Sequence, residues 1–564
     1  MKSEMLKYTW DLGQADRAAI GEMARAMGIP RIVAQVLLLR GVTTPEAAHR
    51  FLNPSTDNLS DPFLLTDMRA AVERIALARD RGETVLVFGD YDVDGIAATA
   101  LLTRALERFG LRDVKFGMPN RLVEGYGLNP ERVLQARDEG VSLIITVDNG
   151  IAAQDAARAA REYNIDLIIT DHHNLDDSLP LALAIINPKR EAEDHPAQHL
   201  CGAGVAFKLA WALTGGIADL DVVALGTVAD VVPLQGENRD LVAMGLEQAR
   251  KKPRPGLYAL SRVARVDLDR LRAEDIAFQL APRINAGGRM GDGFIGLRLL
   301  LTDEPEEAHV LARELDAANE ERRLLEQTIL DDALARLEAS GEHDRSSVVL
   351  GSRNWHAGVV GIVASRLQKM YHCPAVLVAF DENGDGRGSA RSVGDFDVCQ
   401  AVGACQEHLI AYGGHRAAAG MSLREENLPA FQEMFEAAVA GSITDEHLCP
   451  RLNVDAQVAL SEMDSRLVTQ LDQLEPFGHA NPSPVFSLYG AEVVHQSWRQ
   501  LNGNHLRFTL REGPRVMVAI GFRMGQRYDE LVDSPMIDLV FTPRFNHWLG
   551  ESTIQLVLKD WRRC

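Results

Sequence analysis

Short apolar runs alternate with helix-compatible segments through the first half of the chain. Five runs have the length and continuous hydrophobicity of buried parallel strands: Thr84–Phe88, Val114–Met118, Ser142–Val147, Asp166–Thr170 and Leu183–Ile186. Helical patterns at Ala97–Arg108, Pro130–Arg137 and Ile151–Glu162 lie between several of them. The alternation predicts a doubly wound α/β domain, whose ligand site belongs at the carboxyl ends of the strands.

The other regions have different patterns. Residues 1–80 are mainly helix-compatible, and residues 303–345 place apolar side chains at the spacing of one long amphipathic helix. A second strand and helix alternation covers residues 346–448, and short β-like runs fill residues 449–564. We therefore expect an α/β protein in which two α/β lobes, the first at residues 81–302, are joined by a long helix and followed by a small β-barrel.

Composition narrows the class of protein without deciding its partner. The 564 residues carry a formal net charge of −21, which argues against a nonspecific basic nucleic-acid binder. The acidity is uneven, since residues 303–345 hold 14 acidic and 5 basic residues. A local basic groove elsewhere therefore remains compatible with the sequence.

Cysteine usage and hydropathy indicate the compartment. The six cysteines form no CxxC pair, so we expect reduced thiols and no zinc ribbon. No apolar run approaches the ~18 residues of a membrane span, and the segment Met1–Glu4 does not have the form of a signal peptide. We expect a cytoplasmic protein with no membrane contact.

Three carboxylates follow the first predicted strand directly. Asp90, Asp92 and Asp94 alternate with Tyr91 and Val93 before a glycine. Like charges gathered at a strand end are costly unless a cation lies among them, and a divalent metal is the usual solution. The alternative interpretation is a solvated acidic turn.

Further polar clusters favour the metal. Asp148 follows the third predicted strand, Asp171-His172-His173 follow the fourth, and Asp230 ends the apolar run that starts at Val222. Adjacent parallel strands would bring the first two of these clusters beside Asp92 and Asp94. Carboxylates with imidazole and no thiolate suit Mn²⁺ or Mg²⁺. The residues alone predict a di-metal hydrolase acting on phosphate esters, because two ions can activate water and neutralise phosphoryl oxygens.

These elements, in this order, resemble the motifs of the DHH phosphoesterase superfamily. They are Asp-Tyr-Asp-Val-Asp-Gly at 90–95, Val-Asp-Asn-Gly at 147–150, Asp-His-His at 171–173 and Thr-Val-Ala-Asp-Val-Val-Pro-Leu at 227–234. Further stretches at 119–127, 281–289, 355–361, 388–392, 413–420 and 476–482 are similar to the bacterial single-stranded-DNA-specific exonucleases of that superfamily. The resemblance covers essentially the whole chain. It implies a DHH domain at 81–302, a DHH-associated domain at 346–448 and an OB-like fold at 449–564.

The resemblance also implies the roles of the clustered residues. The implied metal ligands are Asp92, Asp94, Asp148, His172 and Asp230, with Asp148 as the bridging carboxylate. Asp90 occupies an acidic position of the family and either ligates a metal or orients a water. His173 would contact the phosphate or act as an acid, and the alternative is a supporting role. Phe88 stands where the inorganic pyrophosphatases of the superfamily have a histidine, so we expect one metal to be more open to water or substrate.

Substrate contacts are implied in both lobes. The candidates are Arg121, Arg283, Asn285, Arg289, Ser389, Arg391 and His415. Arginine offers planar donors that suit backbone phosphates, although Arg283 and Arg289 could instead form buried salt bridges. Gly413 and Gly414 predict a close-approach backbone turn beside His415, and the alternative for these glycines is a tight domain interface.

Aromatic and basic residues of the last domain could form a surface for single-stranded DNA. Trp498, Arg507, Arg544 and Trp548 are the candidates, together with Phe508 and Phe545. The alternative for the two phenylalanines is a place in the barrel core.

We expect a 5′→3′ exonuclease that degrades single-stranded DNA to 5′-mononucleotides with two Mn²⁺ or Mg²⁺ ions, in DNA repair and recombination. The resemblance implies a monomer acting on single-stranded DNA with a 5′ end, together with single-strand-binding protein and a RecQ-type helicase. One alternative is a phosphodiesterase for short oligonucleotides or cyclic dinucleotides, and another is a non-catalytic replication scaffold.

Overall fold

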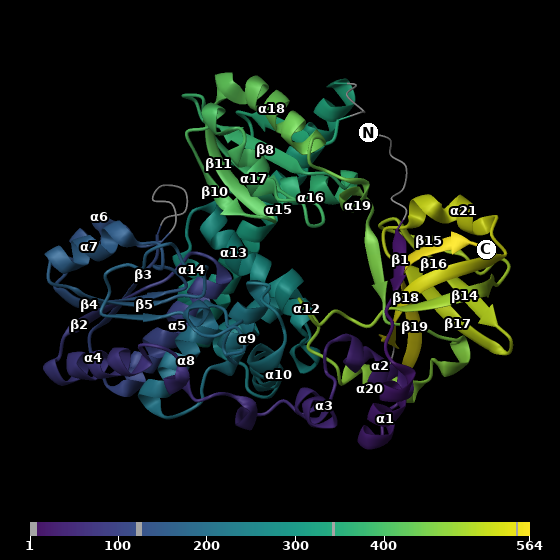
Figure 1. The fold of residues 1–564 in the computed structure, drawn as a ribbon, viewed down its shortest axis with the longest axis horizontal. Helices are drawn as coiled ribbons and strands as arrows, with labels where there is room; N and C mark the ends of the chain where they lie inside the picture. Colours follow the sequence, from purple (N-terminus) through teal and green to yellow (C-terminus); the bar gives the residue numbers. More distant parts are fainter. Residues whose placement is uncertain (1–7, 120–126, 341–344, 549–550) are drawn as a thin grey trace. The chain divides into compact units, whose positions relative to one another are not determined.

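The structure, a computed structural model, describes residues 8–119, 127–340, 345–548 and 551–564 (Figure 1). The chain forms two compact units. The larger consists of residues 11–288, 293–314 and 453–564, and the smaller consists mainly of residues 315–452. The six cysteines are free thiols, as the sequence predicts. In the described part of the chain, none of the helices combines the length and hydropathy that a membrane span requires.

A five-stranded parallel sheet forms the centre of the first domain. Its strand order is β3 (Val114–Gly117), β2 (Thr84–Phe88), β4 (Val141–Val147), β5 (Asp166–Thr170) and β6 (Ala184–Ile186). All neighbouring pairs are parallel. The predicted strands are confirmed within one residue at each end. Because the chain moves from β2 to β3 on one side and then to β4 on the other, the order reverses between β2 and β4, which is where such folds bind ligands.

Helices cover both faces of this sheet (Figure 1). Leu86 and Phe88 pack with the apolar side chains of α6 (Pro130–Asp138) and α7 (Gln154–Glu162). Val85 and Val87 point to the opposite face, because side chains alternate along a strand, and they are equally buried. The remaining helices of the domain are α4 (Met68–Arg81), α5 (Val93–Phe109), α8 (Gly202–Thr214), α9 (Leu220–Ala229), α10 (Gly236–Lys251), α11 (Pro255–Ala264), α12 (Ala273–Asp275), α13 (Ala281–Met290) and α14 (Phe294–Leu301).

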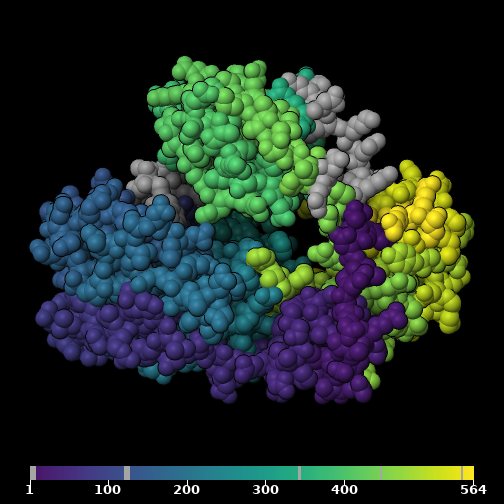
Figure 2. Space-filling model, viewed as in Figure 1, coloured from purple at the N-terminus to yellow at the C-terminus, as the bar shows by residue number. Residues whose placement is uncertain are grey.

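The first three helices pack on the C-terminal domain. They are α1 (Arg17–Met27), α2 (Arg31–Leu39) and α3 (Pro45–Leu52), and their buried side chains share one hydrophobic core with that domain. Figure 2 shows the two ends of the sequence, purple and yellow-green, side by side. Amphipathic spacing shows which face of a helix is apolar but not what covers it, so this partnership could not be predicted.

The C-terminal domain is a curled β-sheet. Its order is β13 (Ala456–Gln457), β14 (Phe486–Val493), β18 (Met536–Trp548), β19 (Glu551–Arg563), β17 (Arg515–Gly521), β16 (His505–Glu512) and β15 (Arg499–Leu501). Helices α20 (Ser465–Asp472) and α21 (Tyr528–Val532) accompany it. β14 also pairs with β16, only through Glu492 with Arg511 and Val493 with Leu510. The expected barrel is therefore incompletely closed, a geometry that OB folds share.

The smaller unit contains the second predicted α/β lobe. Its sheet has the order β10 (Ala411–His415), β11 (Ala418–Arg424), β9 (Asp385–Arg391), β8 (Ala375–Phe380) and β7 (Val348–Ser352). Its helices are α16 (Val360–Tyr371), α17 (Val398–Gly403), α18 (Leu428–Ala440) and α19 (Asp445–Leu448). Outside the two lobes, β1 (Thr9–Leu12) pairs with β12 (Arg451–Val454). The predicted long helix is α15 (Pro305–Ser340), which has 36 residues and begins in the larger unit.

Candidate metal centre

The acidic turn after β2 is shaped by the start of α5. Asp92 is the N-cap of that helix, and its Oδ1 accepts hydrogen bonds from the backbone N–H groups of Asp94 at 3.0 Å and Gly95 at 3.1 Å. A Cβ on Gly95 would lie 2.6 Å from the backbone of Asp90. Glycine therefore allows the turn to fold tightly enough to gather Asp90, Asp92 and Asp94 in one place.

Asp148 enters the centre from the end of β4. Its backbone has a φ of 62°, a left-handed conformation that aspartate tolerates better than most residues. The Asp148 N–H donates to the carbonyl of Thr170 at the end of β5. The carboxylate is 3% exposed, so the turn directs a charge into the protein at the point where the strand order reverses.

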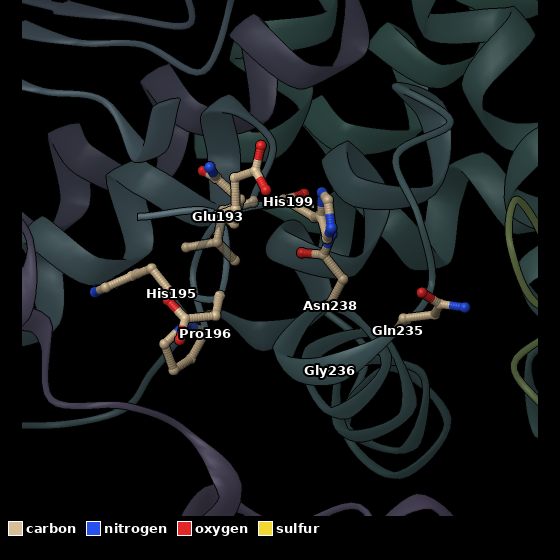
Figure 3. Close-up of a pocket in the computed structure, with 10 residues that line it drawn as sticks. Glu193, His195, Pro196, His199, Gln235, Gly236 and Asn238 are labelled. Carbon is tan, nitrogen blue, oxygen red and sulfur yellow. Dashed lines mark hydrogen bonds between the residues drawn. The ribbon is translucent and has the colours of Figure 1, made fainter. Parts of the chain in front are cut away.

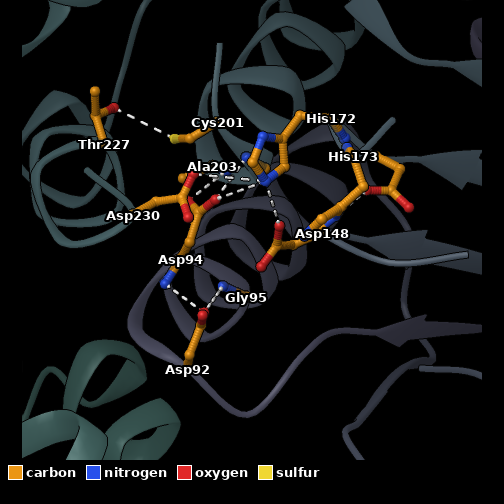
Figure 4. A network of polar contacts seen from close by, with 12 residues as sticks. Asp92, Asp94, Gly95, Asp148, His172, His173, Cys201, Ala203, Thr227 and Asp230 are labelled. Atoms are coloured by element: carbon orange, nitrogen blue, oxygen red, sulfur yellow. Dashed lines mark hydrogen bonds and ion pairs between the residues drawn. The ribbon is translucent and has the colours of Figure 1, made fainter. Parts of the chain in front are cut away.

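His172 lies where three carboxylates meet (Figure 4). Its Nε2 is 3.1 Å from Asp148 Oδ1, 3.6 Å from Asp230 Oδ2 and 3.8 Å from Asp94 Oδ2. Three overlapping sets place their ligand atoms within 4.8 Å of one another: Asp94 with His172 and Asp230, Asp90 with Asp92 and Asp148, and Asp148 with His172 and His173. The structure thus brings together all seven predicted residues of the centre.

The N-terminus of α8 completes the centre, and sequence reasoning missed it. The N–H groups of Gly202 and Ala203 donate to the Asp94 carboxylate at 2.6 and 2.9 Å. The positive end of a helix stabilises such a carboxylate. A Cβ on Gly202 would lie 2.4 Å from the Cβ of Asp148, and one on Gly226 would lie 2.6 Å from Asp94 Oδ1. Glycines in apolar helices gave no sequence signal for this close approach.

The electrostatics of the cluster fit a bound cation. Burial, with the charges of Asp94, Asp92 and Asp90, raises the pKa of Asp148 well above its ordinary value. Burial and the charges of Asp94 and Asp92 likewise raise the pKa of Asp230 to about 8. A divalent ion would relieve both the burial cost and the repulsion.

His172 is suited to hold such an ion. Burial lowers its pKa, which favours the neutral ring that offers a lone pair. Within the described part of the chain, its buried Nε2 makes no hydrogen bond, although carboxylate oxygens surround it. The oxygen and nitrogen donors present are those that Mn²⁺ and Mg²⁺ accept. The residues therefore fit a divalent metal centre.

His173 is held differently from His172. Its Nδ1 lies 2.7 Å from Asp171 Oδ1, and Asp171 also accepts from the N–H groups of Ile151, His172 and His173. Burial alone would lower the pKa of His173, but the hydrogen bond and charge of Asp171 raise it to about 9. Burial alone would raise the pKa of Asp171, but the hydrogen bond and charge of His173 and the N–H donors lower it. The sequence places Asp171 in the Asp-His-His motif but indicates no role for it. In the structure, Asp171 orients the ring of His173.

The candidate substrate contacts of the first lobe lie on or near α13. Arg283 is buried and donates to the carbonyl of Gln279 at 2.7 Å, whereas Asn285 is half-buried. Arg289 donates to the carbonyl of Gly358 at 3.0 Å. Arg121 lies outside the described residues. Phe88 is fully buried in the sheet, in keeping with its apolar character.

The candidates of the second lobe lie on its sheet. Arg391 donates to Ser389 Oγ at 2.6 Å and to Ser365 Oγ at 3.1 Å, which fixes both side chains on β9. His415 is exposed on the edge strand β10. Gly413 and Gly414 belong to that strand and not to a turn, because they pair with Gly420 and Ala419 of β11. The prediction of a turn was wrong; ladder hydrogen bonds overrode the glycine signal.

The aromatic and basic candidates of the C-terminal domain are spread over several strands. Trp498 is half-buried against the domain core, and Arg507 is exposed on β16. Arg544, on β18, pairs with Glu274 at 2.9 Å. Phe508 is fully buried, so the core interpretation holds for it, whereas Phe545 is half-buried beside His547. Trp548 ends β18.

Comparison with known families gives the class of the protein. The DHH family N-terminal domain matches residues 84–231, the DHHA1 domain matches residues 345–441 and the RecJ OB domain matches residues 454–560. The first match contains every residue of the metal cluster. The fold and the site therefore define a DHH-family protein with a DHHA1 domain.

Individual relatives narrow the class. The chain is 35% identical to the single-stranded-DNA-specific exonuclease RecJ of Bacillus subtilis, covering 98% of this chain and 71% of that protein. It is 37% identical to the enzyme of the same name from Escherichia coli, covering 94% of this chain and 96% of that protein. The chain belongs to the RecJ family.

Solved structures agree with this assignment. A crystal structure of RecJ in complex with Mn²⁺ from Thermus thermophilus matches with a TM-score of 0.86 and 30% identity, covering 99% of this chain and 80% of that one. A second structure of that protein, in complex with Mg²⁺, matches with a TM-score of 0.79 and 29% identity, covering 99% and 79%. The similarity thus extends over all domains described above.

Proposed function

We propose that the protein is a metal-dependent exonuclease that degrades single-stranded DNA in the 5′→3′ direction and releases 5′-mononucleotides, in DNA repair and recombination. The observation that carries the proposal is the convergence of Asp94, Asp148, Asp230 and His172 at the switch point of the sheet. The relatives named as single-stranded-DNA-specific exonucleases, and the Mn²⁺ and Mg²⁺ complexes of one of them, support it.

The three overlapping sets of ligand atoms suggest how two ions would be held. Asp94, His172 and Asp230 would hold one Mn²⁺ or Mg²⁺ ion, and Asp90 and Asp92 the other. Asp148 belongs to the set of Asp90 and Asp92 and to that of His172 and His173, so its carboxylate would help to hold both ions. When bound, two such ions supply an activated water and neutralise the charge that develops on the phosphate oxygens.

The chain's own groups would orient these parts. The N–H groups at the start of α8 hold the Asp94 carboxylate, and Asp171 fixes the ring of His173. We propose that His173 contacts the scissile phosphate, since its ring lies within the same cluster as Asp148 and His172.

Binding of the strand would use positively charged and polar groups beyond the centre. Our candidates are Arg121, Arg283, Asn285, Arg289, Ser389, Arg391 and His415 for phosphates, and Trp498, Arg507, Arg544 and Trp548 for the strand farther from the cut. Guanidinium groups bind phosphates, and aromatic rings stack on bases whatever the sequence. We propose that the enzyme acts as a monomer. Because a single strand must first be unwound from its duplex, we also propose that a RecQ-type helicase exposes the substrate and that single-strand-binding protein coats it.

Digestion of end-labelled DNA tests this function. Single strands and duplexes, labelled at either end, are incubated with Mn²⁺, Mg²⁺ or a chelator. The proposal expects metal-dependent release of a labelled mononucleotide first from the 5′ end of the single strand. Release from the 3′ end first, or equal cleavage of a blunt duplex, contradicts it. Preference for a dinucleotide over a long strand would indicate an oligonucleotide phosphodiesterase instead.

A further inference from the structure

The residue after Asp230 has a backbone that its side chain does not favour. Val231 has a φ of 61°, which is uncommon for a β-branched residue and costs free energy. The side chain is 64% exposed, so its own packing does not hold it in place. A strained backbone persists only where the surrounding structure determines it. Contacts with neighbouring segments must therefore hold Val231–Gln235, which is called here the Asp230 loop.

The end of the Asp230 loop borders a pocket, which Gln235 alone of the loop residues lines. A pocket of about 250 Å³ lies there, lined by residues of the segment 193–200 and by Gln235, Gly236 and Asn238 (Figure 3). Asn238 spans the two segments, since its Nδ2 donates to the carbonyls of Pro233 at 3.0 Å and His199 at 2.5 Å. On this side the restraint on the loop is the hydrogen bond from Asn238 to Pro233, because the pocket supplies no packing atoms to Gln235.

The other side rests on the C-terminal domain. The linker turn, defined as Pro476–Pro482, lies against the Asp230 loop within the same compact unit. The Leu234 N–H donates to the carbonyl of His479 at 2.8 Å, and Gln235 Nε2 donates to the carbonyl of Ala480 at 3.2 Å. A Cβ on Gly478 would lie 2.7 Å from Leu234 Cδ1, so the two segments meet without a gap.

The linker turn is itself firmly held. Asn481 is fully buried, and its Nδ2 donates to the carbonyls of Leu474 at 2.9 Å and Pro476 at 2.8 Å. Arg40, the residue that follows α2, donates to Asn481 Oδ1 at 2.8 Å and to the carbonyl of Pro482 at 2.6 Å. The turn is thus a rigid surface against which the loop can be fixed.

We infer that the linker turn is a positioning element for Asp230 and thereby sets the affinity of the metal centre. It acts through Leu234 and Gln235 and contributes no residue to the metal cluster. The inference rests on the proposed metal centre and extends it: a segment at the entrance of the DNA-binding domain determines how well the catalytic domain holds its ions. Groups that orient a metal ligand typically change metal affinity by about 10–100-fold when altered.

Titration of Mn²⁺ into protein without DNA tests the inference. Free Mn²⁺ is followed by electron paramagnetic resonance for the full chain, Gly478→Ala, Gln235→Ala and the control Gly216→Ala. Gly216 has no atom within 4 Å of a built Cβ. Gly478→Ala should weaken Mn²⁺ binding about tenfold, and Gln235→Ala, which removes one exposed hydrogen bond, should weaken it about two- to threefold. Excess Mn²⁺ should restore the rate of hydrolysis.

The outcomes separate this inference from the proposed function. If the unaltered protein binds no Mn²⁺, the metal centre itself is refuted. If it binds Mn²⁺ and folded Gly478→Ala binds equally well, the positioning role is refuted. If Gly478→Ala does not fold, Gln235→Ala decides, because Gln235 is exposed and its loss leaves the backbone bond of Leu234 intact. Unchanged affinity in that variant overturns the inference, and weakened affinity sustains it.

Discussion

Gly202 faces Asp148 across a space that no side chain could share, since a built Cβ would lie 2.4 Å from the Cβ of the aspartate. The same residue donates its N–H to Asp94. The carboxylates can converge only because small residues let the start of α8 approach them. At the scale of single residues, the centre depends on these glycines as well as on its acids.

Gly202→Ala should therefore impair the centre without altering any ligand. The added methyl must displace Asp148 or the start of α8, and we expect Mn²⁺ affinity and kcat each to fall about 10–100-fold. Gly216→Ala, on the loop after the same helix, is the matched control. Mn²⁺ titration and steady-state kinetics measure both variants, and equal affinities in the two would contradict the packing argument.

Asp171→Asn tests the orientation of His173. The amide keeps the shape of the carboxylate but loses the charge that holds the ring through Nδ1. We expect kcat to fall about 10–100-fold while KM for single-stranded DNA changes little. Asp177→Asn, on the exposed loop that follows, is the control. A change confined to KM would show that Asp171 serves binding instead.

The sequence pointed to the acids and histidines of the centre but not to their supports. Asp94, Asp148 and His172 follow predicted strands, and the ends of neighbouring parallel strands must meet. The contributions of Gly202, Ala203 and Asp171 depend on which atoms face one another. That is a property of tertiary packing, which no local pattern encodes.

At the scale of elements, hydrophobic patterns predicted the sheet well and its partners poorly. Continuous apolar runs gave β2, β4 and β5 nearly to the residue, because strands buried on both faces have no polar alternation to confuse them. The docking of α1–α3 on the C-terminal core was not predictable, and Gly413–Gly414 formed a strand. Long-range packing decided both cases.

A buried ion pair joins α8 to α10. Lys208 and Glu237 are almost fully buried and lie 2.6 Å apart, and Lys208 also donates to the carbonyl of Ser60. Lys208→Met leaves an uncompensated buried carboxylate and should lower the free energy of unfolding by ~3–5 kcal/mol. Urea denaturation measures this change.

The exposed pair of Lys251 with Glu247 provides the control for that experiment. Lys251→Met removes an i,i+4 pair in water and should cost less than ~0.5 kcal/mol. Similar losses in the two variants would mean that burial does not set the strength of the Lys208 pair.

At the scale of the whole molecule, the protein is acidic although its proposed substrate, DNA, is a polyanion. A net charge of −21 repels DNA at long range, so affinity must come from local cationic groups and from the metal centre. Binding should therefore involve few phosphate contacts and depend on the particular arginines that make them.

Arg507→Ala tests one such contact. The side chain is exposed on β16, and its loss should weaken binding of single-stranded DNA and reduce the slope of log K against log salt by ~0.7. Arg511→Ala, on the same strand but paired with Glu492 at 3.4 Å, is the control and should leave the slope unchanged. Fluorescence anisotropy over a range of salt concentrations measures both variants. Equal slopes for Arg507→Ala and the unaltered protein would show that Arg507 makes no contact with a DNA phosphate.

The proposed metal centre depends most on Asp148, the carboxylate shared by two of the ligand sets. Asn fits its left-handed backbone and keeps its shape, so Asp148→Asn removes only the charge. The decisive measurement is release of 5′-mononucleotides from a 5′-phosphorylated single strand with saturating Mn²⁺. We predict that Asp148→Asn loses hydrolysis to the background level while it still binds the strand. Hydrolysis by the purified variant at a rate near that of the unaltered protein would contradict the proposed centre.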